Sequence, residues 1–498
     1  MITAITLIPL IAALGAFLQP GRDGRLARAW ALGGSLASLA LTLKLAWNFI
    51  TVGGGVQFVE RHEWIPSLGI QYFVGVDGLN FLLLLLAAII APVSVLASWD
   101  VQDKKSIYFP LLSLEFTGLF GAFTALNFYH WFLYFELSLV PVFFLIKFFG
   151  GERRDEAAMK FFLFTVLGSV AMLLGFQLLY LKTGTFDFLA LAGLASTGTL
   201  PAMVGPLYGW IFLAVLLGLW VKTPLVPFHI WQPEAYTQAP TAVSILLSAL
   251  LSKLGVYGFL RLILPIFPEA FKAHSVFLLT ITVATILLGA FAAMRQNDLK
   301  KLLTYSSLNH VGYCLLGICA VGATRTGLNV DAQTPALQGA ILQMFSHGLT
   351  VAGLFYLVGR LEARTGSRYL TDFGGLRAVT PRFATLFTIL TFSSIGLPFL
   401  AGFASEFPIF YGSYGLAPVF TLAAIPALLT TAIFLLTLLQ RVFTGPLVEK
   451  WKSIPDLSLV EWITAGPLIV LIVWVGVTPG YWLRASSEVV DYILKNYR

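Results

Sequence analysis

Residues 205–262 decide the fold of this chain and read GPLYGWIFLAVLLGLWVKTPLVPFHIWQPEAYTQAPTAVSILLSALLSKLGVYGFLRL. Two apolar runs of membrane-spanning length flank a short segment that holds Pro224 and Pro227. Lys222 ends the first run, and Lys253 lies inside the second. A lysine in hydrocarbon is costly, so each one needs a counter-charge, a water-filled cavity or a function. The stretch therefore predicts two transmembrane segments, the first of them interrupted, that carry functional lysines.

The composition of the whole chain extends this interpretation. Hydrophobic residues make up 58% of the 498 residues and charged residues only 11%, which excludes a string of soluble domains. Apolar windows of about 20 residues recur from one end to the other. We therefore expect an all-α polytopic membrane protein with about 14 transmembrane helices, near residues 2–18, 29–50, 79–98, 107–126, 128–148, 159–181, 206–228, 241–264, 275–294, 302–321, 335–359, 382–412, 418–440 and 462–482.

The basic residues indicate how the chain is oriented. The net charge is +7, but Lys and Arg gather in the loops that follow odd-numbered spans, such as residues 153–154, 300–301 and 360–382. This asymmetry follows the positive-inside rule, so we expect both termini on the non-cytoplasmic side, lipids around the protein and no nucleic-acid partner. The two cysteines, Cys314 and Cys319, share one apolar span and form no metal or redox motif.

Two carboxylates accompany the lysines. Glu115 and Glu136 lie within spans 4 and 5, and a carboxylate at that depth is expected to face the protein interior. Pro141 follows Glu136 and should loosen the backbone around it. We predict that Glu136 is the partner of Lys222. The alternative is a pair of buried carboxylates that bond only to neighbouring hydroxyl groups.

Spans 7 and 12 share a pattern that indicates an internal repeat. Lys222 stands two residues before Pro224, and Glu406 stands two residues before Pro408 in a span already broken by Gly396. Interrupted helices in corresponding positions of two halves are typical of inverted repeats with an ion site at the interruption. Spans 4–8 and 9–13 then form two inverted five-helix repeats, with helices 7 and 12 discontinuous.

This symmetry predicts how the polypeptide is divided. Residues 1–106 form the N-terminal helices 1–3, and residues 107–264 form the first repeat. Residues 275–440 form the inverted second repeat, and residues 441–498 contain the C-terminal helix 14.

Two histidines lie within apolar spans of the second half, His310 in span 10 and His347 in span 11. A pair of intramembrane histidines can ligate a b-type haem, but no second pair is available, and the neighbouring residues carry hydroxyl and amide groups. A proton relay fits better, because histidine titrates nearest neutral pH and has two nitrogens. The remaining alternative is a neutral core histidine with both nitrogens satisfied.

These groups suggest a mechanism. In a poorly solvated region the proton affinity of Lys222 depends on the charge of Glu136, and the reverse. Movement of the interrupted helix would separate the pair and pass a proton to Lys253, then along His310, His347 and Glu406 to an exit. The sequence carries no dinucleotide fingerprint and no Fe–S cysteine set. We therefore expect no cofactor in this chain, and the energy must come from partner subunits.

Several of these segments, taken together, are similar to those of a known family. They are VGVDGLNFLLLLL (74–86), FLYFELSLVPVFFLI (132–146), GGERRDEAAMKFFLFTVLGS (150–169), WVKTPLVPFHIWQPEAYTQAPTAVS (220–244), NDLKKLLTYSSLNHVGYCLLG (297–317), QMFSHGLTVAGLFYLVGRL (343–361) and LAGFASEF (400–407). The protein resembles the antiporter-like, proton-pumping subunit 4 of respiratory complex I and of photosynthetic NDH-1.

This resemblance implies a fourteen-helix subunit of a membrane arm that pumps protons. It assigns the central hydrophilic axis to Glu136, Lys222, Lys253 and Glu406. It also implies that FMN, Fe–S clusters and quinone bind to partner subunits, that antiporter-like subunits 2 and 5 are neighbours, and that the complex lies in a bacterial inner membrane or a thylakoid membrane.

Two departures from the family pattern stand out. The family's LPDAH reads QPEAY here, which puts Tyr236 at the histidine position, and its LPGLSGFVGE reads LPFLAGFASE. The competing class is an Mrp-type cation/proton antiporter subunit, in which a lysine is expected at the position of Glu406. A third class, a purely structural membrane-arm subunit, explains the helices but not the cost of the buried charges.

Overall fold

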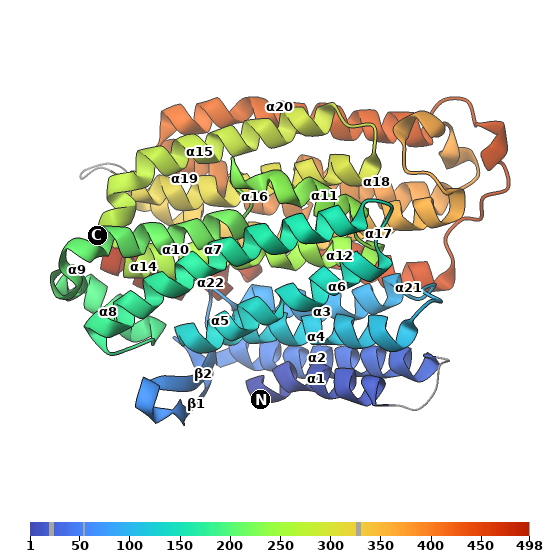
Figure 1. Ribbon diagram of the computed structural model, residues 1–498. Coiled ribbons are helices and arrows are strands. Elements are labelled where there is room, and N and C mark those ends of the chain that lie inside the picture. The colour runs from blue at the N-terminus through green and yellow to red at the C-terminus, as the bar shows by residue number, and fades with distance from the viewer. Residues whose placement is uncertain (19–23, 53–54, 325–329, 498) are drawn as a thin grey trace.

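The computed structural model describes residues 1–18, 24–52, 55–324 and 330–497 (Figure 1). The chain folds into a bundle of helices that lie side by side, as the sequence predicts. The helices are α1 (Ile2–Phe17), α2 (Arg25–Val52), α3 (Phe81–Ala97), α4 (Lys105–Thr124), α5 (Phe128–Leu137), α6 (Leu139–Phe149), α7 (Arg154–Thr183), α8 (Phe188–Ser196), α9 (Thr199–Val204), α10 (Tyr208–Lys222), α11 (Trp231–Gln238), α12 (Thr241–Leu246), α13 (Ser252–Gly258), α14 (Leu264–Ile266), α15 (Pro268–Met294), α16 (Leu299–Gly322), α17 (Gln333–Thr365), α18 (Pro381–Ile395), α19 (Ala401–Leu416), α20 (Pro418–Phe443), α21 (Leu459–Val477) and α22 (Pro479–Tyr497).

Among the described residues, ten helices are long and apolar enough to cross a membrane. The shorter apolar helices α1 and α3 account for two further windows. The remaining windows fall on α16 and on the interrupted pair α18–α19. A helical membrane fold is thus confirmed, and the number of helices that cross the bilayer stays a prediction.

The interruptions predicted from proline and glycine are present. The seventh span breaks after α10 and resumes as α11, and the twelfth span breaks between α18 and α19. Gly396 ends α18 in a left-handed conformation with φ of 84°, which glycine adopts without steric cost. The fifth span is also divided, since α5 ends at Leu137 and α6 begins at Leu139, close to Pro141 as expected.

The eighth span contains a deviation that the sequence did not indicate. The helices α12, α13 and α14 form one continuous rod, but two π-helical turns, η4 (Leu247–Leu251) and η5 (Phe259–Ile263), separate them. A π-helical turn inserts one residue into the helix and frees a backbone carbonyl, and such turns are frequent at functional sites. Lys253 lies directly after the first of these turns.

The connection between the second and third spans contains a β-hairpin, which adds two short strands to the helical fold. Strand β1 (Gln57–Ile65) pairs antiparallel with β2 (Ile70–Val76), and His62 lies opposite Tyr72. Gly69 closes the turn at φ of 63°. The hairpin extends from one end of the bundle, near α8 and α9 (Figure 1).

The C-terminal region also differs from the expected single helix 14. The helix expected near 462–482 ends at Val477, and a second helix, α22, begins at Pro479. Proline has no backbone N–H to continue the preceding helix, so the chain turns there. α22 packs against α17 and α14.

The basic loops meet at one end of the bundle. Three backbone hydrogen bonds link these loops. The N–H of Gly151 donates to the carbonyl of Gln238 at 2.8 Å, and the N–H of Leu299 donates to the carbonyl of Arg368 at 2.9 Å. The N–H of Gly375 donates to the carbonyl of Thr444 at 3.0 Å. Burial alone would lower the pKa of Arg368, but Asp298 and Glu362 raise it above its usual value. Ion pairs thus hold the positively charged loops together.

The helix contacts repeat in a way that fits two related halves. α4 packs on α5 as α15 packs on α16, and α7 packs on α10 as α17 packs on α19. In the predicted numbering these are spans 4 and 5 against 9 and 10, and spans 6 and 7 against 11 and 12. The pattern is what two five-helix repeats would produce, and the boundaries 107–264 and 275–440 stay a prediction.

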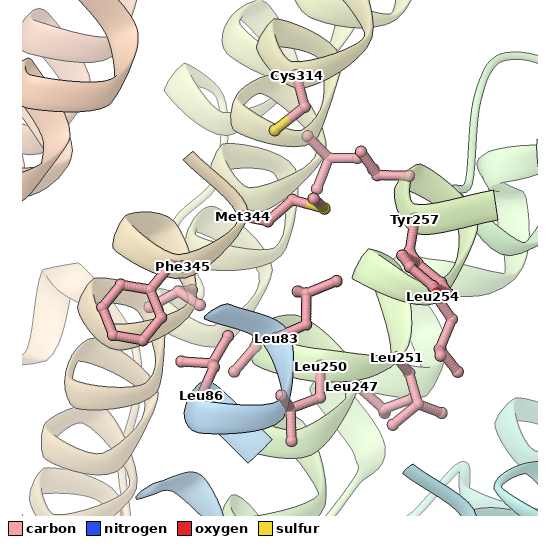
Figure 2. Packing of buried hydrophobic residues seen from close by; sticks show 14 of the residues in the cluster. Leu83, Leu86, Leu247, Leu250, Leu251, Leu254, Tyr257, Cys314, Met344 and Phe345 are labelled. Atoms are coloured by element: carbon pink, nitrogen blue, oxygen red, sulfur yellow. The ribbon is translucent and has the colours of Figure 1, made fainter. Parts of the chain in front are cut away.

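Two long helices, one from each predicted repeat, are buried in the bundle. The segment 241–266 and α17 are buried throughout their most apolar windows. Figure 2 shows Leu83 and Leu86 of α3 packed beside Leu247 and Leu250 of the eighth span and Met344 of α17. This apolar cluster joins α3, the eighth span and α17 in the core of the bundle.

Candidate functional site

The seven predicted site residues come from seven different helices. They are Glu115 on α4, Glu136 on α5, Lys222 on α10, Lys253 on α13, His310 on α16, His347 on α17 and Glu406 on α19. All are buried except Glu136, which is half-buried. The structure divides them into two clusters, the second of which joins Lys253 of the first predicted repeat to three residues of the second.

The first cluster contains Lys222 with two carboxylates. Glu136 and Glu115 both lie within electrostatic range of the Lys222 ammonium, which also sits 4.4 Å from the ring centroid of Phe135. No direct ion pair within 4.0 Å joins Lys222 to either carboxylate among the described residues. The carboxylate oxygens of Glu115 have no hydrogen-bond partner among those residues. Lys222 and the two carboxylates are thus close enough to influence one another electrostatically, but no direct ion pair among the described residues fixes their positions.

The break after Lys222 leaves backbone carbonyls that the helix no longer satisfies. The indole of Trp231 donates to the carbonyl of Val221 at 3.1 Å, and that of Trp220 donates to Val226 at 3.0 Å. Thr285 of α15 accepts the N–H of Val226 at 3.1 Å. These bonds stabilise the break, and the negative end of the α10 dipole favours a cation at Lys222.

The second cluster begins at Lys253, which lies in the middle of the protein. Its Nζ donates to the carbonyl of Ser248 at 2.6 Å and lies 2.7 Å from Nδ1 of His347. The hydroxyl of Ser252 is 3.4 Å away. A lysine ammonium has only donors, so Nδ1 of His347 accepts when the lysine is charged. The same contact can reverse its direction when the lysine is neutral, as proton transfer requires.

His347 stacks on His310, with ring centroids 5.2 Å apart and planes inclined by 24°. Nδ1 of His310 lies 2.7 Å from the carbonyl of Ser306, and Nε2 lies 2.9 Å from the carbonyl of Ser394. Carbonyl oxygens only accept, so both bonds form together only when both nitrogens carry protons. Neither nitrogen is free for a metal, which argues against the haem alternative.

Glu406 completes the second cluster. Its Oε1 lies 3.5 Å from Nε2 of His310 and accepts a hydrogen bond from Nε2 of Gln343 at 3.1 Å. The α18–α19 break makes room for it, since a Cβ on Gly396 would lie 3.1 Å from its Oε2. A small polar cavity with room for about one water molecule lies here, lined by His310, Gln343, His347, Thr350, Ser393, Ser394, Gly402 and Glu406.

The contacts run in the order Lys253, His347, His310, Glu406. The sequence interpretation placed His310 before His347, and the geometry reverses these two. The two clusters approach each other where α13 meets the end of α10, because a Cβ on Gly255 would lie 2.1 Å from Oγ1 of Thr223.

Sequence reasoning missed a buried ion pair beside the site. Arg261 donates to both carboxylate oxygens of Asp77, at 2.7 and 2.6 Å. Asp77 also stabilises the turn before α3, because its Oδ1 accepts the N–H of Leu79 at 3.0 Å. An arginine in the apolar eighth span is as costly as its lysine, and that signal was available in the sequence.

No group of three or more His, Cys, Asp or Glu side chains that could hold a metal ion occurs in the described part of the chain. Cys314 and Cys319 are both buried and not joined in a disulfide. The lysine, histidine and glutamate side chains of the two clusters are groups that are able to act as acids and bases.

A membrane helix bundle with interrupted helices and an internal line of lysine, histidine and glutamate defines a class of ion-handling or proton-handling membrane proteins. The chain belongs to the family described as NADH:quinone oxidoreductase/Mrp antiporter, transmembrane, whose model matches residues 125–433.

Two relatives match almost the whole chain. The F(420)H(2) dehydrogenase subunit M of Methanosarcina mazei is 35% identical over 510 residues, which cover 99% of this chain and 96% of the relative. The NADH-quinone oxidoreductase subunit M of Rickettsia prowazekii is 33% identical over 499 residues, which cover 99% and 98%.

Solved structures agree with these relatives. A chain of respiratory complex I from Thermus thermophilus with bound NADH is 28% identical, has a TM-score of 0.88 and is covered over 100% of both chains. A chain of the Mrp complex from Dietzia sp. DQ12-45-1b has a TM-score of 0.83 at 21% identity, with 99% and 97% of the chains covered, and shares the fold.

Proposed function

We propose that this chain is a proton-translocating subunit in the membrane arm of a quinone-reducing oxidoreductase complex. The proposal rests on one observation, the contiguous line of contacts from Lys253 through His347 and His310 to Glu406. Each of the four side chains is able to bind and release a proton, and all four are buried. A structural subunit has no need of such a line, because each buried ionisable group is costly in a membrane.

In this proposal, the first cluster controls when a proton passes to Lys253. Lys222 lies at the end of a broken helix, with Glu136 and Glu115 near it and no direct ion pair among the described residues. Its charge state therefore depends on where α10 and α5 lie relative to each other. Movement at the break would change this coupling, and a proton would pass to Lys253 and onward to Glu406.

The energy for this transfer comes from outside the chain in our proposal. The 33% and 35% identical relatives are named as oxidoreductase or dehydrogenase subunits. We propose that partner subunits oxidise the donor, hold FMN and Fe–S clusters and reduce the quinone, and that antiporter-like subunits 2 and 5 flank this chain. We also propose a bacterial inner membrane or thylakoid membrane, with both termini on the non-cytoplasmic side.

The alternative is an Mrp-type antiporter subunit. Glu406 favours the oxidoreductase, because it offers a carboxylate to His310 where a lysine would repel a protonated ring. The intact assembly distinguishes the two. Copurification with an Fe–S-containing hydrophilic arm supports the oxidoreductase, and copurification with small cation-transport subunits alone supports the antiporter.

The decisive test of pumping uses membrane vesicles that contain the intact complex. Lys222→Ala and Glu136→Ala are each expected to abolish or strongly reduce proton translocation driven by quinone reduction. Should both variants translocate protons at the wild-type rate, the proposed role of the first cluster is wrong.

A further inference from the structure

Tyr236 stands in α11, outside the line of acids and bases, but contacts the turn that precedes Lys253. Its side chain is fully buried, and its hydroxyl donates to the carbonyl of Leu247 at 2.7 Å. Leu247 is the first residue of the π-helical turn η4, and its carbonyl also accepts the backbone N–H of Ser252. The tyrosine thus bonds to the oxygen that defines the turn.

This π-helical turn determines which acceptor Lys253 finds. In an ordinary α-helix the N–H of Ser252 would bond to the carbonyl four residues earlier, that of Ser248. Here that N–H bonds to Leu247, so the carbonyl of Ser248 is left to side chains and accepts Nζ of Lys253 at 2.6 Å and the hydroxyl of Ser252 at 3.0 Å. The π-helical form of η4 therefore creates the acceptor that holds the lysine beside His347.

The helix that carries Tyr236 is itself fixed from both halves of the chain. Glu234 pairs with Arg153, beside the start of α7, at 3.0 Å and with Lys301 of α16 at 3.5 Å. The carbonyl of Tyr236 accepts the hydroxyl of Ser244 at 2.7 Å. α11 thus connects the ion pairs of Glu234 to the π-helical turn η4 that precedes Lys253.

We propose that Tyr236 is a positioning residue for Lys253, because its hydroxyl holds η4 in the form that presents the carbonyl of Ser248 to the lysine. This inference rests on the proposed proton translocation. Tyr236 carries no proton in this role; it sets where Lys253 lies relative to His347.

The test compares Tyr236→Phe with Tyr208→Phe in vesicles that contain the intact complex. Both changes remove one buried hydroxyl that donates to a backbone carbonyl, because Tyr208 donates to Ile266 at 3.1 Å far from Lys253. Tyr236→Phe should leave assembly and quinone reduction unchanged but lower the protons translocated per quinone by about threefold or more, since one lost hydrogen bond displaces the lysine. The pH profile of translocation should also shift. Tyr208→Phe should behave as the wild type.

Two further variants keep the outcomes distinct. Tyr236→His, which retains a polar ring that can donate, should restore part of the coupling. Lys253→Ala shows whether the proposed function holds at all. If Lys253→Ala stops translocation while Tyr236→Phe leaves the ratio and the pH profile unchanged, Tyr236 is not a positioning residue; if Lys253→Ala also has no effect, the proposed function is wrong.

Discussion

Lys253 and His347 lie on two helices buried in the centre of the bundle, and their side-chain nitrogens are 2.7 Å apart. The lysine belongs to the first predicted repeat and the histidine to the second. This single contact joins a base of one half to a base of the other. It makes the boundary between the halves a place where a proton can cross.

The contact predicts that the two residues act as one unit. Lys253→Met and His347→Ala should each lower proton translocation by about a hundredfold, the scale of a lost proton-transfer group. The double variant should be no worse than either single variant, because groups that act together are not additive. Proton uptake by vesicles, normalised to quinone reduction, measures this. His274→Ala on α15 is the control, since Nδ1 of His274 bonds within its own helix to the carbonyl of Ala270 and its ring packs against Phe212, outside both clusters.

The carboxylate at the far end of the line gives a second prediction. Glu406→Gln keeps the size of the side chain but removes the charge that lies 3.5 Å from Nε2 of His310. Translocation should fall by about tenfold or more, whereas assembly is retained because the change is isosteric. Glu449→Gln, on an exposed residue, should have no effect. Normal pumping by Glu406→Gln would remove Glu406 from the line.

The third prediction distinguishes two possible roles of Lys222, a fixed positive charge and a group that exchanges a proton. Lys222→Arg keeps a positive charge near Glu136 and Glu115, but a guanidinium does not release its proton in proteins. Assembly should therefore survive while translocation is lost. A purely structural role for the charge predicts the opposite, a tolerated substitution. Lys182→Arg, at an exposed position at the end of α7, serves as the matched control in the same vesicle assay.

The parts of this fold that could be predicted from the sequence are those with a local cause. Proline and glycine near Lys222 and Glu406 disrupt a helix wherever it packs, so both breaks were predictable. The ionisable residues predicted for the site were equally visible, and they lie in the protein interior except for the half-buried Glu136. The helices themselves were predictable because apolar length alone specifies a spanning helix.

The parts that could not be predicted depend on contacts between segments far apart in the chain. Asp77 and Arg261 are 184 residues apart, and nothing in the sequence around either residue indicates that the two form a pair. The π-helical turn before Lys253 has no residue pattern of its own, because its hydrogen bonds are shared with Tyr236 from another helix. The hairpin β1–β2 is stabilised by pairing between its two strands, which neither strand's sequence specifies on its own.

The missed ion pair gives a prediction about stability. Asp77→Asn leaves the guanidinium of Arg261 buried without its charge partner, which costs about 3–5 kcal/mol. The solubilised complex should therefore unfold at a lower temperature. Asp77→Asn with Arg261→Met should recover much of the loss, since neither charge then remains alone. Lys452→Gln, which breaks an exposed pair with Glu449, should change stability by about 1 kcal/mol or less. A double variant as unstable as the sum of its parts would contradict the pairing.

A glycine at the junction of the two clusters gives the last prediction. Replacing glycine by alanine inside an ordinary helix stabilises it by about 1 kcal/mol. At Gly255 the new Cβ would lie 2.1 Å from Oγ1 and 2.7 Å from the backbone N of Thr223, so α13 and the end of α10 must move apart. Gly255→Ala should therefore lower thermal stability and disturb Lys222, the neighbour of Thr223, which reduces translocation. Gly209→Ala, in α10 with nothing within 4 Å of its Cβ, should stabilise or leave the complex unchanged. If both variants had the same thermal stability and translocation rate, the close contact between Gly255 and Thr223 would not determine how the two clusters are placed.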